Sequence, residues 1–503
     1  MIDEKTGRSG TITAFPVVCQ IDMNKAIRRV SVFTLLLVLA LLVRATWVQF
    51  YDSQALADSK YNERSLIEQY SQPLGNIIVG GNAVTGSERS TGGLAYQRTY
   101  QNGPLYAPVT GYTSQVYGAT QLEGIYQKVL DGTDSQLQNP LDMLERKQPR
   151  PGNVITTIDP AVQKAGYQAL GGKVGAAVAI DPTTGKILGM VSTPSYNPSQ
   201  ITGSDGAAWK QLTTDPSQPM LNRAIRQPLP PGSTFKLVVA AAALTAGLYP
   251  NVDTPTQSPN PYTLPGTSTV LTNEEASLPC KNATIRTALQ YSCNTVFAHI
   301  AYQLGEQKIS AMADKFGFNQ QLDMPVRADA SVYPSHMNAP QTALSGIGQF
   351  DDTATPLQMA MVSATIANGG KLVTPHMVSQ VTDGNGNTLK NYDNSTQTKQ
   401  VISSFVASQL QSAMVTVVQT GTGVNARVPG VTVGGKTGTA QHGLNNSGTP
   451  YAWFTSYGKS DSTGKEVAVA VMVEQSDAAR SEVSGNGLAG PVAKAMIQAA
   501  LAN

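Results

Sequence analysis

The most distinctive pattern in the chain is a long apolar run near its start. Residues 30–51 are predominantly apolar, and a helix of about 20 such residues can cross the hydrocarbon core of a bilayer. Lys25, Arg28 and Arg29 stand immediately before the run, and positive residues tend to stay on the cytoplasmic side of a membrane. We therefore predict a cytoplasmic N-terminus at residues 1–29, a single-pass plasma-membrane anchor at 30–51, and an extracytoplasmic location for the rest of the chain.

Two alternatives remain open for this segment. Residues 30–43 form the strongest part of the run and are short enough for a cleaved signal peptide, although no convincing cleavage site follows them. Arg44 can extend its side chain to the membrane interface, which favours an uncleaved anchor. Met23 is a second candidate start of translation, because it begins a compact signal-anchor sequence, and Cys19 would then be absent from the protein.

Beyond the apolar run, the pattern predicts two further domains. Residues 52–150 are predicted to form a small, irregular, β-rich and non-catalytic domain that ends at the Pro- and Gly-rich residues 149–152. Residues 151–503 are predicted to form an α+β domain, in which a polar stretch at 383–399 is a surface loop. The predicted regular elements are a strand at 154–158, a helix from Pro160, a hairpin around the turn 181–185, a helix at 233–247, a strand at 466–473 and a helix at 491–501.

Composition narrows the classes of function. The 35 Lys and Arg residues nearly balance the 33 Asp and Glu residues, so the chain lacks the strongly basic domain of an electrostatic nucleic-acid binder. Its four histidines are far apart, and its three cysteines form no zinc-finger spacing. We therefore expect no nucleic-acid partner, no metal site and no cofactor.

The segment with the clearest chemistry follows Pro230, Pro231 and Gly232, which interrupt the preceding chain. Ser233 then opens a predicted helix, and Lys236 lies one turn later on the same face. Serine is a weak nucleophile unless a neighbouring base removes its proton, and lysine can be that base when burial lowers its pKa. The apolar run after Lys236 predicts a buried helix and a dry setting for this pair.

Two further short motifs follow this pair in the chain. Ser292-Cys293-Asn294 lies between predicted helices, and on its own it is equally typical of a helix cap. The glycines of segment 434–440 permit close approach of a ligand, and its lysine and hydroxyls suit a carboxylate. Two other Ser-x-x-Lys sequences, at 456–459 and 462–465, lie in a polar turn between strands and are predicted to have no catalytic role. The segment 434–440 contains, in order, Lys436, Thr437, Gly438 and Thr439.

Together and in this order, Ser-x-x-Lys, Ser-x-Asn and Lys-Thr-Gly are the signature of penicillin-recognising serine enzymes. The sequence therefore resembles the class B penicillin-binding proteins, which are monofunctional D,D-transpeptidases, over about residues 152–501. The anchor and the short segment YAPVTGY at 106–112 are most similar to the actinobacterial penicillin-binding protein A type. This resemblance implies a transpeptidase domain of the serine β-lactamase-like fold, with an antiparallel sheet and helices, after a non-catalytic pedestal domain.

The resemblance also implies roles for individual residues. Ser233 would attack the penultimate D-Ala carbonyl of a stem peptide, with Lys236 as the base. Ser292 would relay a proton to the leaving amine, and Asn294 would bind the peptide backbone of the substrate. Lys436 would supply positive charge to the Ser292 hydroxyl and to the substrate carboxylate, and the amides of Ser233 and Thr439 would form the oxyanion hole. The remaining substrate-binding residues would be Thr437, Gly438 and Thr439.

Peptidoglycan stem peptides, β-lactam antibiotics and the cytoplasmic membrane are the expected partners. A SEDS-type glycan polymerase and other cell-wall or division proteins are further partners that the family resemblance implies. Three other functions remain open, namely a D,D-carboxypeptidase, a serine β-lactamase and a non-catalytic sensor or scaffold. A β-lactamase needs a means of activating water, and Glu306 is the only glutamate between Asn294 and Lys436. A bifunctional enzyme would need a glycosyltransferase domain of about 200 residues, for which residues 52–150 are too few.

Cys293 stands where most members of the family have a small or acidic residue. Cys280 lies 13 positions earlier, in the part of the chain predicted to be outside the cytoplasm, where disulfides persist. We predict a disulfide between Cys280 and Cys293 that braces the loop before the second motif. Two buried free thiols are the alternative.

Overall fold

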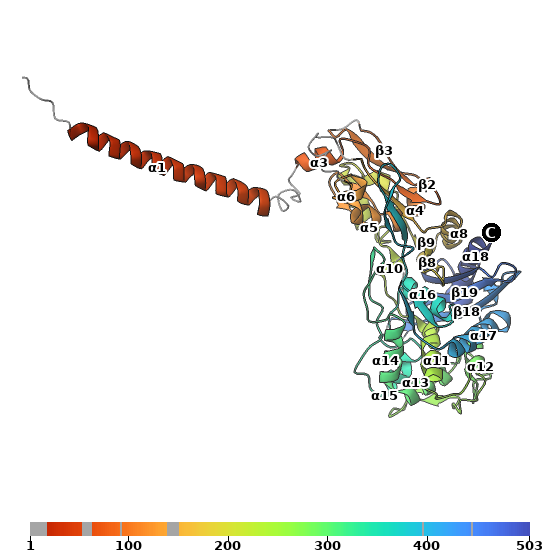
Figure 1. The fold of residues 1–503 in the computed structure, drawn as a ribbon. Coiled ribbons are helices and arrows are strands. Elements are labelled where there is room, and N and C mark those ends of the chain that lie inside the picture. Colours follow the sequence, from red (N-terminus) through yellow and green to blue (C-terminus); the bar gives the residue numbers. More distant parts are fainter. Residues whose placement is uncertain are drawn as a thin grey trace, which may run out of the picture. The chain divides into compact units, whose positions relative to one another are not determined.

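The computed structural model describes residues 18–52, 63–90, 93–137, 150–394, 397–443 and 446–502 (Figure 1). Of the predicted cytoplasmic segment 1–29, residues 1–17 lie outside the described residues. The chain divides into two compact units, one ending at Gln69 and the other spanning Tyr70–Asn503. Each unit is described by itself below.

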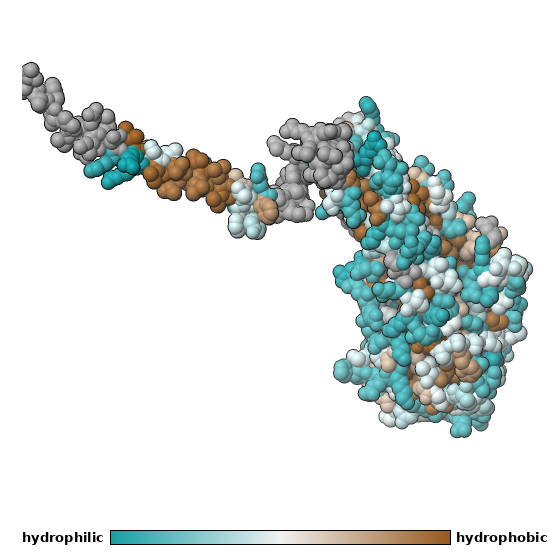
Figure 2. Space-filling model, in the orientation of Figure 1, coloured by the Kyte–Doolittle hydropathy of each residue, from teal (hydrophilic) through white to brown (hydrophobic). Residues whose placement is uncertain are grey.

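The first unit contains the predicted anchor as one long helix. Helix α1 spans Val18–Trp47 and continues as a π-helical turn at Val48–Asp52. The stretch Lys25–Tyr51 is long and apolar enough to cross a membrane, and its apolar side chains are exposed (Figure 2). Trp47 stacks on Tyr51 at the end of this stretch, where aromatic rings are typical of a membrane interface. A short helix, α3 (Glu63–Gln69), follows.

The second unit is built around an antiparallel five-stranded sheet with the order β18-β19-β20-β8-β9. Successive residues of its central strands point to opposite faces of the sheet, and the residues on both faces are apolar. A hydrophobic core therefore packs against each face. For example, Ala177 and Ala179 pack on one side while Ala176 and Val178 pack on the other. The strands are β8 (Val174–Ile180), β9 (Ile187–Thr193), β18 (Val431–Ala440), β19 (Tyr451–Ser460) and β20 (Glu466–Gln475).

Helices cover both faces of this sheet. Helices α8 (Pro160–Leu170) and α18 (Gly490–Leu501) pack on one face and on each other, and α16 (Pro356–Ala367) packs on the other face (Figure 1). Behind α16 lies a helical layer that contains the first two motifs. Its helices are α11 (Lys236–Thr245), α12 (Ile285–Gln290), α13 (Asn294–Leu304), α14 (Glu306–Lys315), α15 (Ala339–Ser345) and α17 (Ser404–Thr420).

A second five-stranded sheet joins the N-terminal part of this unit to the rest. Its order is β16-β15-β7-β1-β2, and β1 runs parallel to β7. Strands from both sides of the predicted boundary near residue 150 therefore share one sheet. Its strands are β1 (Ile77–Val79), β2 (Asn82–Ala83), β7 (Asn153–Thr156), β15 (Val378–Thr382) and β16 (Thr388–Asn391).

In its described residues, the rest of the N-terminal part contains two short hairpins and three short helices. A buried ion pair stabilises it, because Arg98 Nε donates to Glu123 Oε1 at 2.7 Å and both side chains are almost fully buried. The elements are β3 (Thr85–Arg89), β4 (Tyr96–Tyr100), α4 (Gly103–Thr110), β5 (Thr113–Ser114), β6 (Gly118–Ala119), α5 (Gln121–Ile125) and α6 (Gln127–Leu130).

Most of the elements predicted from the pattern are confirmed. The predicted helix at Pro160 is α8, and the Asp159 side chain caps it by accepting from the amides of Ala161 and Val162. The hairpin around 181–185 is β8–β9, and the last strand and helix are β20 and α18. The prediction of a loop at 383–399 is wrong in part. Residues 388–391 form β16, and Thr398 starts β17 (Thr398–Gln400), which pairs with β14 (Lys371–Val373). These polar strands lie at sheet edges, where one face needs no apolar residues.

Candidate active site

The predicted nucleophile lies on a tight turn between the sheet and the helical layer. Ser233 is half-buried in a 3-10 turn, Gly232–Phe235, and α11 begins directly after it with Lys236. Gly232 has a φ of +53° and donates its amide to Gly348 O at 3.1 Å. A side chain at Gly348 would collide with Gly232, since its Cβ would lie 2.2 Å from Gly232 O. These glycines therefore permit the close contact that holds the turn in place.

The edge strand β18 lies directly beside this turn. A Cβ at Gly438 would be 2.9 Å from Pro231 O, so the glycine of the third motif lets the strand approach the nucleophile turn. Because β18 is the last strand of its sheet, its outer edge is free of a neighbouring strand. Backbone groups around Thr439 are thus placed where an extended peptide can pair with them.

The Ser292 side chain connects the two lysines. Lys436 Nζ donates to Ser292 Oγ at 3.0 Å, and Lys236 Nζ lies 3.3 Å from the same oxygen. Lys236 Nζ also donates to Ser292 O and to Asn294 Oδ1, each at 2.7 Å. The three motifs therefore converge, and the four side chains Lys236, Ser292, Asn294 and Lys436 form one hydrogen-bonded cluster.

Ser233 stands beside this cluster without joining it. Among the described residues, no hydrogen bond links the Ser233 hydroxyl to Lys236 or to another side chain. Catalytic hydrogen bonds are often long before substrate binds, so the lack of a bond between Ser233 and Lys236 is compatible with proton transfer in a substrate complex. Thr437, predicted to bind substrate, has its Oγ1 2.7 Å from Thr422 Oγ1.

Burial changes the charge state of both lysines. Lys236 is fully buried, and burial, then repulsion from Lys436, holds its pKa well below the usual lysine range. Burial also lowers the pKa of Lys436, to about 7. The ring of Phe297, whose centre is 5.7 Å from Lys236 Nζ, completes the dry surroundings. The lowered pKa favours the neutral form of Lys236, which can accept a proton, while Lys436 retains part of its charge near neutral pH.

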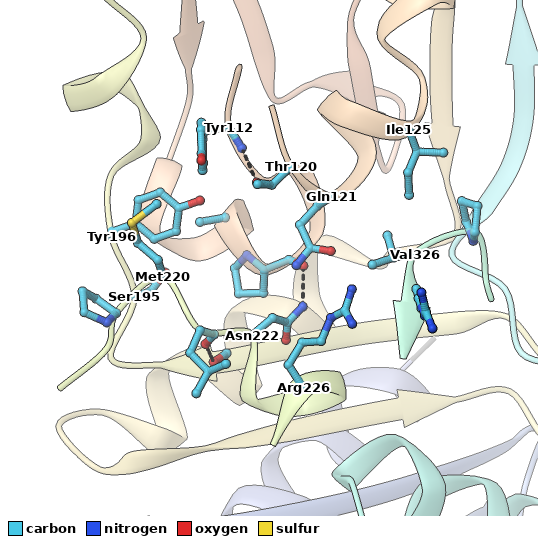
Figure 3. Close-up of a pocket in the computed structure, with 17 residues that line it drawn as sticks. Tyr112, Thr120, Gln121, Ile125, Ser195, Tyr196, Met220, Asn222, Arg226 and Val326 are labelled. Carbon is cyan, nitrogen blue, oxygen red and sulfur yellow. Dashed lines mark hydrogen bonds between the residues drawn. The ribbon is translucent and has the colours of Figure 1, made fainter. Parts of the chain in front are cut away.

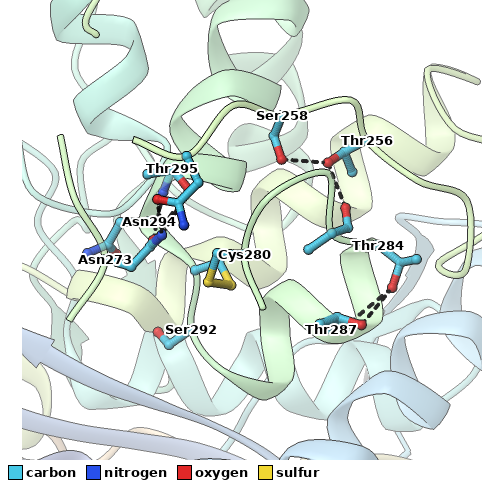
Figure 4. The surroundings of a disulfide bond; sticks show 12 residues. Thr256, Ser258, Asn273, Cys280, Thr284, Thr287, Ser292, Asn294 and Thr295 are labelled. Carbon is cyan, nitrogen blue, oxygen red and sulfur yellow. Dashed lines mark hydrogen bonds between the residues drawn. A yellow bond between two sulfur atoms is a disulfide. The ribbon is translucent and has the colours of Figure 1, made fainter. Parts of the chain in front are cut away.

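One carboxylate that no sequence motif indicates influences both lysines. Glu274 is an exposed residue whose charge raises the pKa of both Lys236 and Lys436. Its neighbour Asn273 fixes the loop, because Asn273 Oδ1 accepts from the Thr295 amide at 3.1 Å (Figure 4). Glu274 precedes the second motif and so lies outside the stretch between Asn294 and Lys436, where the glutamate of a β-lactamase would be expected. No local sequence pattern around Glu274 indicates this placement.

The structure contains the disulfide between Cys280 and Cys293 (Figure 4). Both residues are fully buried, and Cys293 immediately precedes the first residue of α13. The neighbouring Ser292 has a φ of +58°, which is unusual for a residue with a side chain. The disulfide therefore attaches the 273–282 loop to the turn that holds Ser292 in this conformation.

Two family models match the chain. The model described as penicillin binding protein transpeptidase domain matches residues 175–498, and the penicillin binding protein A dimerisation domain matches residues 74–154. The chain belongs to the penicillin-binding protein transpeptidase family. This finding agrees with the class that the three motifs and the fold define.

Individual relatives are similar over nearly the whole chain. The peptidoglycan D,D-transpeptidase PbpA of Mycolicibacterium smegmatis is 37% identical over 497 residues, which cover 95% of this chain and 99% of the relative. The ceftriaxone acyl-enzyme structure of penicillin-binding protein A from M. tuberculosis has a TM-score of 0.80 and 34% identity, and the match covers 86% of this chain and all of that one. The transpeptidase MrdA of Acinetobacter baumannii is 33% identical over 385 residues, covering 68% of this chain and 56% of the relative. The match to the penicillin-binding protein A type is therefore much more complete than the match to MrdA.

Proposed function

We propose that this protein is a peptidoglycan D,D-transpeptidase that forms an acyl-enzyme at Ser233 and is inhibited by β-lactams. The observation that carries the proposal is the Ser292 hydroxyl held between two buried lysines, directly beside the Ser233 turn. The relatives named as D,D-transpeptidases and the β-lactam acyl-enzyme structure of a similar chain support it. The proposed substrate is a stem peptide that ends in D-Ala-D-Ala.

In the first half-reaction, neutral Lys236 accepts the proton of Ser233 as Oγ attacks the penultimate D-Ala carbonyl carbon. The amides of Ser233 and Thr439 stabilise the oxyanion. The C–N bond to the terminal D-Ala then breaks, and the Ser292 hydroxyl gives that nitrogen a proton, which the lysine cluster replaces. Asn294 binds the backbone of the substrate, and Lys436 with Thr437, Gly438 and Thr439 binds its carboxylate side.

In the second half-reaction, the amine of a neighbouring stem attacks the ester carbonyl. A new C–N bond forms, the bond between the acyl carbon and Ser233 Oγ breaks, and the proton from the amine returns to Ser233 through the cluster. The product is a crosslink between two stems. Hydrolysis by water at this step would instead give a carboxypeptidase.

The test of this proposal is labelling of the full-length protein in detergent with a fluorescent penicillin, followed by peptide mass mapping. We expect a stable adduct on the Ser233 peptide that is lost in Ser233→Ala. Ser462→Ala is the matched control, since Ser462 belongs to an exposed Ser-x-x-Lys sequence outside the site. Absence of an adduct would favour a sensor or scaffold, and rapid loss of the adduct would favour a β-lactamase. Reaction of a D-Ala-D-Ala peptide in the presence of an acceptor amine then distinguishes a crosslinked product from a hydrolysed one.

The proposal includes the arrangement of the chain at the membrane. Residues 1–29 are proposed to be cytoplasmic, 30–51 to be the anchor, 52–150 to be the pedestal domain and 151–503 to be the extracytoplasmic transpeptidase domain. A SEDS-type polymerase that supplies glycan strands is the proposed partner of the anchor and pedestal. Reaction of single cysteines on either side of residues 30–51 with an impermeant thiol reagent in whole cells tests the orientation.

A further inference from the structure

A large cavity lies between the N-terminal part of the second unit and the transpeptidase domain (Figure 3). Its volume is about 560 Å³, which is within the range of small-molecule sites. Helices α4 and α5 form one wall. The other wall consists of the end of β9, the 219–222 loop, α10 (Arg223–Arg226) and the start of β13 (Arg327–Ala328). Ser233, Lys236, Ser292 and Lys436 do not line this cavity, so it is separate from the active site.

The charges that line the cavity are of one sign. Arg226 and Arg327 are the charged residues that line it in the described part of the chain, and no carboxylate lines it there. Arg226 forms an ion pair with Asp329, to which its Nη1 donates at 2.8 Å, and Arg327 donates from Nη2 to Gln321. In the described part of the chain, the other guanidinium N–H groups of these two residues have no protein partner. They can therefore donate to an anion, and guanidinium binds carboxylate especially well.

Further polar groups converge on the same space. Ser195 is another lining residue, but its hydroxyl is closed off from solvent and has no hydrogen-bond partner among the described residues, so it does not face the cavity space. Gln121 and Arg226 extend into the space from opposite walls (Figure 3). Asn222 is instead committed to the protein, since its Nδ2 donates to Pro108 O at 2.8 Å and thereby joins the two walls.

The remainder of the lining is mostly apolar, with Thr120 and Ser192 as further polar members. Its apolar and aromatic members are Ala107, Pro108, Tyr112, Ile125, Tyr196, Pro219, Met220, Leu221, Pro325 and Val326. A ligand that combines a terminal carboxylate for the arginines with a body carrying apolar side chains therefore suits this lining. The end of an uncrosslinked stem peptide, D-Ala-D-Ala, has this chemistry.

We propose that this cavity is a second, non-catalytic site for the carboxylate terminus of a stem peptide, with Arg226 and Arg327 binding the carboxylate. Gln121 supplies a polar contact to the peptide backbone. The choice of this peptide as the ligand rests on the proposed function, whereas the inference that the cavity binds a carboxylate rests on its two arginines alone.

The test uses the full-length protein in detergent after saturation with benzylpenicillin, which occupies the active site. The probe is diacetyl-L-Lys-D-Ala-D-Ala, titrated by calorimetry as the free acid and as the C-terminal amide. We expect saturable binding of the acid, and at least about tenfold weaker binding of the amide and of the acid to the Arg226→Gln/Arg327→Gln variant. Arg89→Gln is the control, because Arg89 is an exposed arginine outside the cavity and should leave binding unchanged.

Equal binding of acid and amide, or undiminished binding to the double variant, would overturn the proposal, as would no binding to the wild-type protein. Acylation of the double variant by penicillin checks its fold. If that variant does not fold, Gln121→Glu replaces it, since a carboxylate there should repel the ligand and weaken its binding by a similar factor. If the wild-type protein forms no penicillin adduct, the proposed function fails, but the comparison of wild type with variant still decides whether this second site exists.

Discussion

Two of the places where the second unit buries positive side chains differ in the charged and polar groups that surround the cation. In the N-terminal part, Arg98 is buried with Glu123 as a direct partner at 2.7 Å, and its Nη1 donates to Gly75 O. In the active site, Lys236 and Lys436 are fully buried, share the Ser292 hydroxyl, and form no ion pair among the described residues. Their carboxylate neighbour Glu274 acts through its charge only.

This difference distinguishes Arg98, whose buried charge is structural, from Lys236, whose side chain can take part in proton transfer. A buried cation with a buried anion stays charged, and removal of either partner leaves the other uncompensated. A buried lysine without such a partner loses its proton readily, so it can act as a base at neutral pH. This comparison predicts that substitutions at the two places have opposite effects on activity and stability.

The largest effect on activity is expected for Lys236→Met. This variant removes the proposed base, so acylation by benzylpenicillin should slow by about 10²- to 10⁴-fold. The free energy of unfolding should change by less than about 2 kcal/mol, because relief of lysine burial opposes the loss of its hydrogen bonds. Stopped-flow acylation and urea unfolding measure the two quantities. An unchanged acylation rate would exclude Lys236 as the base.

The corresponding change at the structural site is Arg98→Met. It leaves the Glu123 carboxylate buried without its partner, so the free energy of unfolding should fall by about 3–5 kcal/mol. Acylation of the protein that remains folded should proceed at the wild-type rate. Arg89→Met is a control on the neighbouring strand with an exposed side chain. Equal stability of the Arg98 and Arg89 variants would contradict the contrast drawn here.

A third variant tests the disulfide that braces the active-site turn. Replacing Cys280 and Cys293 together by Ala should lower the free energy of unfolding by about 3 kcal/mol, because the unfolded chain is no longer constrained. Wild-type protein unfolded in a reductant should show the same loss, and intact mass should rise by about 2 Da on reduction, as two thiols replace the disulfide. No change in mass would show that the two thiols are free.

The smallest effect is expected for Glu274→Gln. Glu274 raises the pKa of Lys236 and Lys436, so its removal should lower both. The lysines then lose their protons at lower pH, and the pH profile of acylation should shift towards acid. Glu275→Gln is the matched control on the same loop. A shift towards alkaline pH, or equal profiles for both variants, would contradict the placement of Glu274.

The sequence predicted the parts of the site that depend on short local motifs. Ser233 with Lys236, the Ser-x-Asn triplet and the Lys-Thr-Gly segment each carry their chemistry in three or four neighbouring residues, and the structure brings them together. The disulfide followed from two cysteines on one side of the predicted membrane. Short, nearly continuous apolar runs also predicted β8, β9 and β20, and both faces of those strands are buried.

Features that depend on contacts distant in sequence could not be predicted. The charge of Glu274 acts on the lysines because its neighbour Asn273 binds Thr295 of α13 and so fixes the loop. The hydroxyls of Thr437 and Thr422 are in contact because α17 packs against β18. The sheet shared by β1 and β7 crosses the proposed domain boundary, which no local pattern indicates. The polar strands β16 and β17 carry too few apolar residues to be distinguished from a loop.

The most direct test of a reactive, neutral lysine beside Ser233 is the second-order rate constant of benzylpenicillin acylation as a function of pH. We predict that the rate at neutral pH is already substantial and that its acid limb has an apparent pKa well below the usual lysine value of about 10.4. We also expect the rate to decline once Lys436, whose pKa is about 7, has lost its charge. A rate that rises about tenfold per pH unit up to pH 10 would show a base with an ordinary lysine pKa and would contradict this account.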